Sequence, residues 1–264
     1  MNIRGLLFQP ITEECPYIEG ITAIYENLFV TELEDEDLDN LLGMGFRHFG
    51  EIFFRPICDD CHRCISVRIP VQRFIPSLSV RRLFNRTKGL RVSLEKPIPS
   101  ITAFEIYMEH KKRFKNKDVD DEERYGNYIR SFFHPFRFNR MLTIRDAEIL
   151  VAVSHLDVTA HSMSAVYCYF DEKYGRFSPG KLAIYKEIEL AKEMGIQWLY
   201  LGYYIPSNPH TQYKIQFKPN QLMIGNDQWF DYIDPSGNII RHLPEALIYP
   251  GISRDSQEMP HPEA

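Results

Sequence analysis

The sequence lacks a long apolar run, because no stretch approaches the roughly 20 uncharged apolar residues that a membrane-spanning helix needs. Its start, Met1 to Pro10, lacks the basic segment followed by an apolar segment that is typical of a signal peptide. It also lacks a Walker loop, a dinucleotide-binding glycine fingerprint, a nucleophile elbow and an H-E-x-x-H motif. We therefore expect a cytoplasmic protein that does not bind membranes and that uses none of these common catalytic motifs.

Acidic residues are missing from one region of a chain that is acidic as a whole. The formal net charge is −5, with 36 acidic and 31 basic side chains, which is not typical of a protein that coats nucleic acid over its whole surface. Between His62 and Leu94, however, no Asp or Glu occurs, while basic residues recur at Arg63, Arg68, Arg73, Arg81, Arg82, Arg86, Lys88 and Arg91. The sequence therefore predicts one local basic surface.

The hydrophobic pattern predicts an α+β fold. With 264 residues, of which 44% are hydrophobic, the chain can bury a sizeable core as one large domain or two small ones. Spacing and capping residues predict helices over 35–43, 101–114, 122–133 and 181–194, and strands over 65–71, 149–155, 162–170 and 198–204. A composition shift near residues 118–148 suggests a boundary, so we expect domains over 1–130 and 131–254 and a disordered tail over 255–264.

Cysteine is scarce, but its spacing is informative. Cys58, Cys61 and Cys64 form a C-x-x-C-x-x-C run in a predicted loop, which lets three thiolates converge on one metal ion or cluster. Cys15 is the leading candidate for the fourth ligand, and His62 is a possible substitute. Four thiolates suit either tetrahedral zinc or an iron–sulfur cluster, and the sequence does not separate the two.

The remaining cysteine, Cys168, lies in a predicted strand far along the chain and is interpreted as a small core residue. A disulfide framework is not expected, because a reducing cytosol keeps thiols free.

Two further segments have both a functional and an ordinary interpretation. The run from Arg73 to Arg86 interleaves arginines with aromatic, Ser and Asn residues, which suits contacts to RNA phosphates but also suits a solvated helix face. Ser178-Pro179-Gly180 precedes a helix whose free N–H groups could stabilise an anion or a developing oxyanion, although Ser178 as N-cap and Pro179 at the first helical position explain the same letters.

An ordered series of motifs resembles the arginyl/leucyl-tRNA-protein transferase family over most of the chain. The motifs are Cys15-Pro16-Tyr17, Phe54-Arg55-Pro56 with the cysteine run, Arg68-Ile69-Pro70-Val71, Pro76-Ser77-x-Ser79-x-Arg81-Arg82, Ser164-Ala165-Val166-Tyr167 through Phe170-Asp171, Tyr200-Leu201-Gly202-Tyr203-Tyr204-Ile205 and Tyr213-Lys214-x-x-Phe217-x-Pro219. The C-x-x-C-x-x-C form is similar to the bacterial aspartate/glutamate leucyltransferase branch.

The resemblance implies an N-terminal cysteine-bearing part and a C-terminal acetyltransferase-like (GNAT) fold with a mixed sheet and flanking helices. It implies transfer of leucine from leucyl-tRNA to the N-terminal α-amine of proteins that begin with Asp or Glu, marking them for N-end-rule degradation, with neither ATP nor coenzyme A. The chain departs from the family pattern at Ser178-Pro179-Gly180, usually Ser-Leu-Gly, at Thr211-Gln212, usually Lys-Met, and near Gln221, where a glutamate is usual. Arginine therefore stays open as the alternative donor.

Site residues are assigned on the same resemblance. We expect Asp171 to act as base or amine-orienting carboxylate, and Tyr203 with the Ser178–Gly180 helix start to lie beside the aminoacyl ester. Lys214 or Arg176 would pair with the acceptor carboxylate, and Arg81, Arg82 and Arg86 would contact tRNA. An alternative of another class is a non-catalytic, metal-containing RNA-binding protein, which would not need the motif between Tyr200 and Pro219.

Overall fold

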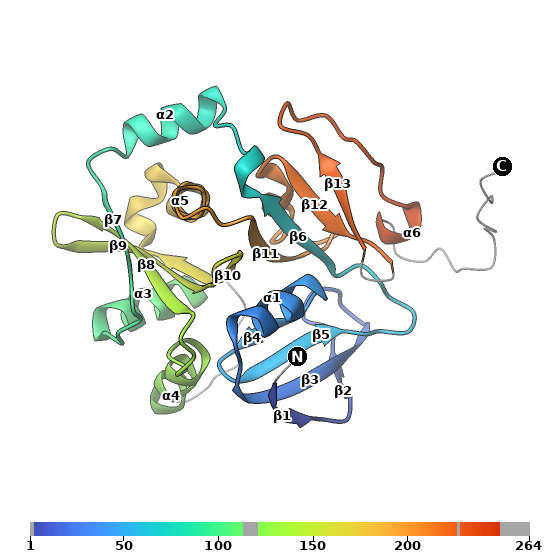
Figure 1. Cartoon of the computed structure of the whole chain (residues 1–264). Coiled ribbons are helices and arrows are strands. Elements are labelled where there is room, and N and C mark those ends of the chain that lie inside the picture. Colours follow the sequence, from blue (N-terminus) through green and yellow to red (C-terminus); the bar gives the residue numbers. More distant parts are fainter. Residues whose placement is uncertain (1–2, 113–120, 226–227, 249–264) are drawn as a thin grey trace.

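The computed structural model describes residues 3–112, 121–225 and 228–248, and its strands form two sheets with helices around them (Figure 1). The predicted α+β class is confirmed. The predicted tail over 255–264 lies outside the described residues. No helix within the described part of the chain is long and apolar enough to cross a membrane.

The first sheet has five strands in the order β1-β3-β5-β4, with β2 also paired to β3. Its elements are β1 (Arg4–Leu7), β2 (Ile11–Glu14), β3 (Thr22–Glu32), β4 (Arg47–Phe49) and β5 (Ile52–Pro56), and α1 (Asp35–Gly43) lies between β3 and β4 in the chain. Helix α1 spans the predicted residues, and acidic side chains in its first turn favour the positive end of the helix dipole. Its leucines pack with Phe53 of β5, with Phe138 just before β8 and with Tyr200 of β11, so one core joins the two sheets.

The second sheet has eight strands in the order β13-β12-β6-β11-β10-β9-β8-β7. The strands are β6 (Ile65–Pro70), β7 (Arg91–Glu95), β8 (Asn139–Asp146), β9 (Ile149–Val158), β10 (Ser162–Phe170), β11 (Trp198–Tyr204), β12 (Asn220–Met223) and β13 (Trp229–Ile233). Strands β6 and β7 precede residue 130, so the domain boundary expected there falls inside the elements of this sheet. The chain passes from the first sheet to the second in the cysteine run between β5 and β6.

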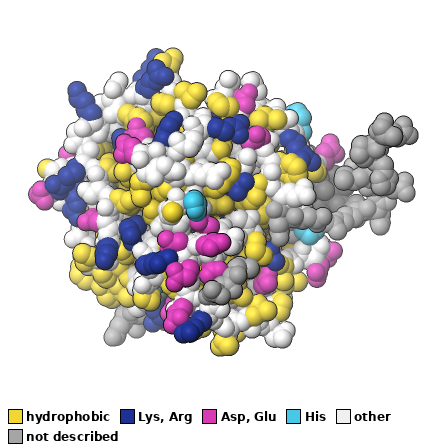
Figure 2. Space-filling model, viewed as in Figure 1, with side chains coloured by type: hydrophobic (Ala, Val, Ile, Leu, Met, Phe, Trp, Pro, Cys, Tyr) yellow, Lys and Arg dark blue, Asp and Glu magenta, His cyan; other side chains and the backbone are white. Residues whose placement is uncertain are grey.

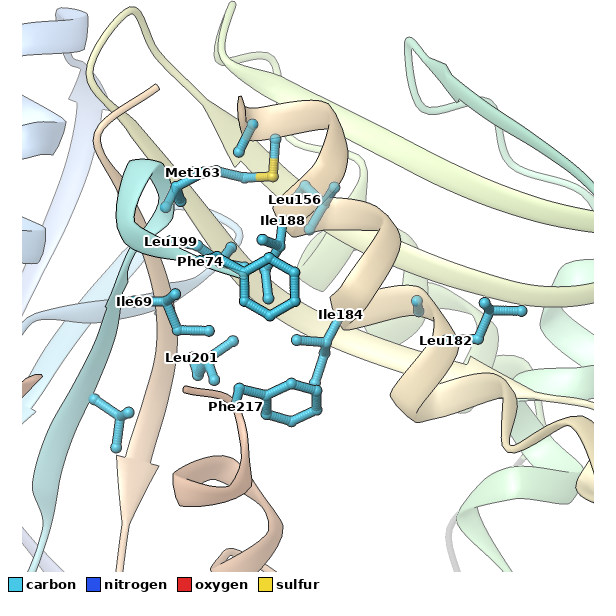
Figure 3. Packing of buried hydrophobic residues seen from close by; sticks show 14 of the residues in the cluster. Ile69, Phe74, Leu156, Met163, Leu182, Ile184, Ile188, Leu199, Leu201 and Phe217 are labelled. Atoms are coloured by element: carbon cyan, nitrogen blue, oxygen red, sulfur yellow. The ribbon is translucent and has the colours of Figure 1, made fainter. Parts of the chain in front are cut away.

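Helices cover both faces of the second sheet. On one face α2 (Leu78–Arg86) and α5 (Pro179–Glu193) bury apolar residues, and Figure 3 shows Ile184 and Ile188 of α5 directed toward the strand residues Ile69 and Leu201. On the other face α3 (Ile101–Lys111) and α4 (Asp121–Phe132) pack around Tyr169. Short elements complete the fold: η1 (Val71–Arg73), η2 (Glu172–Phe177), η3 (Gln212–Gln216) and α6 (Glu245–Ile248).

Strands β10 and β11 are parallel and pair only over a short stretch, from Ser162 opposite Trp198 to Ser164 opposite Tyr200. Beyond it β10 has a register shift between Ala165 and Tyr167, while β11 continues beside β6. The second halves of the two strands therefore separate. Helix α5 follows β10 after η2 and begins near this opening, which positions the site described next.

Candidate active site

A cavity of about 920 Å³ lies where β10 and β11 separate. The second half of β10 forms one side, the first turn of α5 a second side, and the segment around Tyr213 and Lys214 a third. Aromatic and aliphatic side chains such as Phe49, Phe170 and Leu201 make much of its surface apolar. A cavity of this size and character is typical of a site for a small molecule or for the end of a larger substrate.

Glu187 is the buried carboxylate of this cavity, and sequence reasoning missed it. Its exposed fraction is 0%, and Ser154 Oγ donates a hydrogen bond of 2.7 Å to its Oε1, while Oε2 has no hydrogen-bond partner among the described residues. Burial raises the pKa of Glu187 to about 7, against the lowering effect of the Ser154 hydrogen bond. A carboxyl with this pKa can hold or accept a proton near neutral pH.

Cys168 also lines the cavity, although the sequence suggested an ordinary core residue. It packs at the edge of the main hydrophobic core, and burial together with the nearby Glu187 charge raises its pKa above the usual range. The side chain is therefore a neutral thiol and part of the cavity surface rather than a nucleophile.

The first turn of α5 faces the cavity, as expected for Ser178 and Gly180. Ser178 occupies the N-cap position with a left-handed backbone, φ 50°, and Pro179 occupies the first turn. The Ser178 side chain makes no capping hydrogen bond. Ser178 therefore occupies the N-cap position that the ordinary interpretation predicts, but its hydroxyl group does not cap the helix. A Cβ on Gly180 would lie 3.3 Å from Phe170 Cε1, so glycine keeps the helix close to β10.

Tyr203 is not among the described residues that line this cavity. It joins the two sheets instead. Its hydroxyl donates a 2.8 Å hydrogen bond to the carbonyl oxygen of Gly45, and the side chain is only 5% exposed. Burial raises its pKa above the usual range even though Arg47 opposes that shift. It lines a smaller second cavity of about 110 Å³ instead.

Asp171 and Arg176 belong to the η2 segment between β10 and α5. The Asp171 carboxylate accepts a 2.9 Å hydrogen bond from the backbone N–H of Lys173, which closes a turn. Arg176 is exposed, with its guanidinium over the Phe177 ring at 4.7 Å. Neither Asp171 nor Arg176 is among the described residues that line the main cavity or the smaller one.

Lys214 lies between the two cavities and lines both. Its Nζ donates a 2.8 Å hydrogen bond to the carbonyl oxygen of Tyr203. Burial and the nearby Arg47 charge lower the pKa of Lys214 to about 7, with Cys64 acting in the opposite direction. This lysine is therefore the predicted substrate-binding cation that the structure brings to the cavity.

The four predicted ligand cysteines lie in two loops of the N-terminal part and influence one another electrostatically. Cys15 follows β2, and Cys58, Cys61 and Cys64 lie in the connection from β5 to β6. Burial, then the charges of Cys15, Cys61 and Cys58, raise the pKa of Cys64 to about 12. The N–H of Ile24 donates to Cys58 Sγ at 3.3 Å. All four are free and partly buried thiols.

A buried ion pair, His48 with Asp157, was not predicted. His48 Nε2 lies 2.7 Å from Asp157 Oδ2, and their side chains are 1% and 0% exposed. Burial lowers the pKa of His48, but the charge and hydrogen bond of Asp157 outweigh it and raise the pKa overall. With His134 these residues form a group whose possible ligand atoms lie within 4.8 Å of one another. The His48–Asp157 pair means that Asp157 already has a cationic partner.

The predicted tRNA-contacting arginines lie on α2. Arg81, Arg82 and Arg86 are exposed, and Arg81 Nε donates to the carbonyl oxygen of Pro76. Helix α2 packs against α5 through Phe84, whose ring lies 6.3 Å from that of Tyr185. Figure 2 shows basic side chains around the position of α2 and acidic ones gathered over α1. The exposure of these three arginines agrees both with a solvated helix face and with a surface that contacts phosphates.

Comparison with known proteins gives the decisive observation. Residues 13–82 match the family profile described as "Arginine-tRNA-protein transferase, N terminus", and residues 102–224 match "Arginine-tRNA-protein transferase, C terminus". The chain is 31% identical over 230 residues to an aspartate/glutamate leucyltransferase of Campylobacter jejuni, across 85% of this chain and 95% of the relative. This chain belongs to the arginine-tRNA-protein transferase family.

Other relatives carry the same name. Aspartate/glutamate leucyltransferases of Leptospira interrogans and Pseudomonas syringae pv. tomato are 30% and 31% identical, across 85% and 84% of this chain and 91% and 93% of the relatives. Among solved structures, FemX gives a TM-score of 0.46 at 12% identity, across 81% of this chain and 72% of FemX. A likeness at that level does not assign the fold of this family member.

Proposed function

We propose that this family member transfers leucine from leucyl-tRNA to the N-terminal α-amine of proteins that begin with Asp or Glu, which marks them for N-end-rule degradation. The observation that carries the proposal is the match to leucyltransferases over 85% of this chain together with a large, mainly apolar cavity whose described lining contains one buried carboxylate. An apolar cavity suits the side chain of leucine, and the carboxylate suits an amine.

For the second sheet we propose the acetyltransferase-like (GNAT) fold. Support comes from the element order β7, α3, α4, β8, β9, β10, α5, β11 and from the parallel β10–β11 pair between antiparallel neighbours. In α/β sheets ligands bind where neighbouring strands diverge, and the cavity lies at such a point.

The reaction forms one bond and breaks one. The neutral amine nitrogen of the acceptor attacks the carbonyl carbon of the aminoacyl ester, the C–N bond forms, and the C–O bond to the terminal ribose of tRNA breaks. One amine proton leaves through a base, and the released ribose hydroxyl gains a proton. The ester supplies the driving force, so neither ATP nor coenzyme A is required.

We assign the proton-accepting and amine-orienting role to Glu187 rather than to Asp171. Glu187 Oε2 has no hydrogen-bond partner among the described residues, whereas Asp171 accepts the N–H of Lys173. The backbone N–H groups of Gly180 and Lys181 are in the first turn of α5, where no intrahelical partner exists, and they can stabilise the oxyanion. The Ser178 hydroxyl, which makes no cap bond, is a further donor.

The tRNA would lie along α2, with Arg81, Arg82 and Arg86 neutralising its phosphates. This placement is supported by the packing of α2 on α5, the helix whose first turn faces the cavity. The 3′ end would then enter the cavity at the start of α5.

The cysteine site would hold zinc or an iron–sulfur cluster on Cys15, Cys58, Cys61 and Cys64. The residue types suit such a group, since all four thiols are partly buried, the other three influence Cys64 electrostatically, and the Ile24 N–H donates to the Cys58 sulfur. The group of possible metal ligands that already lies together among the described residues is His48, His134 and Asp157, so a bound metal would have to draw the four sulfur atoms closer. A metal there would fix the connection between the sheets, and four thiolates would leave no open position for substrate.

A transfer assay tests the proposed function. Purified protein is incubated with tRNA charged with labelled leucine, arginine or phenylalanine and with peptides that begin with Asp, Glu or Ala, and label in the peptide is counted. We expect leucine to move to Asp and Glu peptides only. Transfer of arginine instead would replace the donor within the same family, and no transfer from any donor would support the RNA-binding alternative.

A further inference from the structure

Among the described residues, the smaller cavity is lined by the basic side chains of Arg47, Lys214 and His48 and by no carboxylate, and His48 is already paired with Asp157. Its volume is about 110 Å³, and Arg47 and Lys214 contribute to its lining together with Gly202 and Tyr203. Lys214, Phe49 and Leu201 line the main cavity as well, so the two spaces adjoin.

Arg47 is a buried guanidinium with unused donors. Its exposed fraction is 7%, Nη1 donates to the Phe46 carbonyl oxygen at 3.3 Å, and neither Nε nor Nη2 has a hydrogen-bond partner among the described residues. The group stacks near the rings of Tyr200 and Tyr203, at 5.3 and 6.0 Å. A buried cation with unsatisfied donors is unfavourable unless an anion pairs with it.

Among the described residues, no hydrogen bond or ion pair joins Arg47 to the nearby Asp157, which influences it only electrostatically. Asp157 Oδ2 lies 2.7 Å from His48 Nε2, and its Oδ1 lies 3.8 Å from His134 Nε2. Lys214 adds a second basic group on the same side of the cavity, and its Nζ makes its hydrogen bond to a neutral carbonyl oxygen. The space between the two therefore favours a negatively charged ligand.

Gly202 locates the point where the two basic groups converge. Its φ of +82° already favours glycine, and a Cβ built there would lie 3.1 Å from Lys214 Nζ and 3.7 Å from Arg47 Nε. Both nitrogens therefore face one small region that the absence of a side chain leaves open. A carboxylate placed nearby could accept hydrogen bonds from both.

We propose that the smaller cavity binds the side-chain carboxylate of the acceptor's N-terminal Asp or Glu, with Arg47 and Lys214 as its donors. This inference rests on the proposed function, and it extends the role expected of Lys214 to a two-cation subsite. A liquid water occupies roughly 30 Å³, so a cavity of about 110 Å³ accommodates a carboxylate with one or two methylenes. The α-amine would remain in the main cavity, where Glu187 lies.

A tRNA phosphate is the other anion that the complex contains. A bridging phosphate carries a ribose on each side, and a small cavity lined by buried side chains does not accommodate that volume. The carboxylate is therefore the better fit, and the experiment separates the two.

The test measures binding and transfer for peptides that begin with Asp or with its neutral isostere Asn. Binding is followed by calorimetry without tRNA, and transfer by label from leucyl-tRNA. The variants are Arg47→Gln, Arg47→Lys and Gly202→Ala, with Arg137→Gln as a matched control because Arg137 is exposed, pairs with Asp35 and Glu34, and is not among the described residues that line either cavity. Thermal unfolding confirms that each variant is folded.

We expect wild type and the control to bind the Asp peptide about 100-fold more tightly than the Asn peptide, as for a desolvated charge pair. Arg47→Gln and Gly202→Ala should remove most of this preference without changing the KM for leucyl-tRNA, and Arg47→Lys should retain part of it. Equal losses for both peptides, a raised KM for leucyl-tRNA, or a wild type without preference would overturn the inference. Because binding is measured without tRNA, failure of leucyl transfer alone would count against the proposed function and not against the carboxylate subsite.

Discussion

Ser154 donates a 2.7 Å hydrogen bond to Glu187, linking the middle of β9 to the buried face of α5 at the surface of the main cavity. Both residues are 0% exposed, so the bond lies in a medium of low polarity. It fixes one carboxylate oxygen, and the other is buried without a hydrogen-bond partner among the described residues. This pair therefore combines a defined geometry with a pKa near neutrality.

Replacing Glu187 by Gln should lower kcat/KM for the acceptor by about 10²–10⁴-fold, the usual loss when a general base is removed. Gln has nearly the same shape, so the tRNA affinity should not change. In wild type, kcat/KM falls with acidification because both Glu187, with a pKa of about 7, and the acceptor amine, with an unperturbed pKa of about 8, become protonated. The logarithm of kcat/KM should thus rise with pH at a limiting slope of about two in wild type and about one in the variant. A slope of two in Glu187→Gln would assign the second proton elsewhere.

Replacing Ser154 by Ala should move the acid limb of the pH profile to higher pH. The Ser154 hydrogen bond lowers the pKa of Glu187, so its loss raises that pKa further above the ordinary value of 4.5. A larger fraction of the variant is then protonated at a given pH, and activity at neutral pH falls while activity at alkaline pH is retained. The double variant Ser154→Ala, Glu187→Gln serves as the control. A shift that persists in it would exclude Glu187 as the titrating group.

Much of the local structure follows from the sequence, because local structure depends on near neighbours. The predicted helix over 35–43 is α1, the helix over 181–194 is α5 within a few residues, and the strands over 149–155 and 162–170 are the antiparallel pair β9 and β10. Caps and periodicity specify such elements directly.

The pairing of the strands was harder to predict from the sequence. Strand β6 pairs with β11, so Ile69 lies opposite Leu199, far along the chain. No local pattern encodes such a partner, which is why a composition shift near residue 130 suggested a boundary that divides the elements of one sheet.

The site residues divide in the same way. Ser178, Gly180 and Lys214 line the main cavity as motif positions suggested. Glu187 was missed because a lone acid in a charged helix is usually solvated, although its spacing from Ile184 and Ile188 on the buried face was a visible signal. Arg47 precedes the region of continuous positive charge, and only the tertiary fold brings it beside Lys214.

Replacing Tyr203 by Phe should destabilise the protein more than it changes the chemistry. The hydroxyl donates to Gly45 across the two sheets, and its removal leaves a buried carbonyl oxygen with a lost partner, at a cost of about 1–3 kcal/mol in the free energy of unfolding. In a protein of this size Tm should fall by about 2–4 °C per kcal/mol. Tyr204→Phe, at the next position of β11, is the control because the Tyr204 hydroxyl makes no hydrogen bond to the described residues. Loss of turnover at unchanged Tm would instead indicate that Tyr203 has a direct role in the reaction.

If the four cysteines bind a metal ion or cluster, as proposed, replacing Cys61 by Ala should remove it, whereas Cys168→Ala should retain it. Cys168 lies in β10 and lines the main cavity, apart from the connection that carries the other cysteines. Elemental analysis and the visible spectrum check metal content, and a brown colour indicates iron–sulfur. Tyr17 lines both cavities two residues after Cys15, so we expect Cys61→Ala also to weaken acceptor binding. Equal metal content in the two variants would contradict the four-cysteine assignment.

Replacing Arg81, Arg82 and Arg86 together by Gln should weaken binding of leucyl-tRNA and flatten its salt dependence. Each lost phosphate contact lowers the slope of log K against log salt by about 0.7–0.9, so the three replacements should lower it by about two to three if all three contact phosphates. A control with Arg4, Arg137 and Arg145 replaced by Gln has the same change in net charge, but these residues belong to β1, the segment before β8, and β8. Filter binding over a range of salt concentrations measures both slopes. If the control lost as much slope as the α2 variant, the interaction would depend on net charge alone, and α2 would be the solvated face that its exposure also permits.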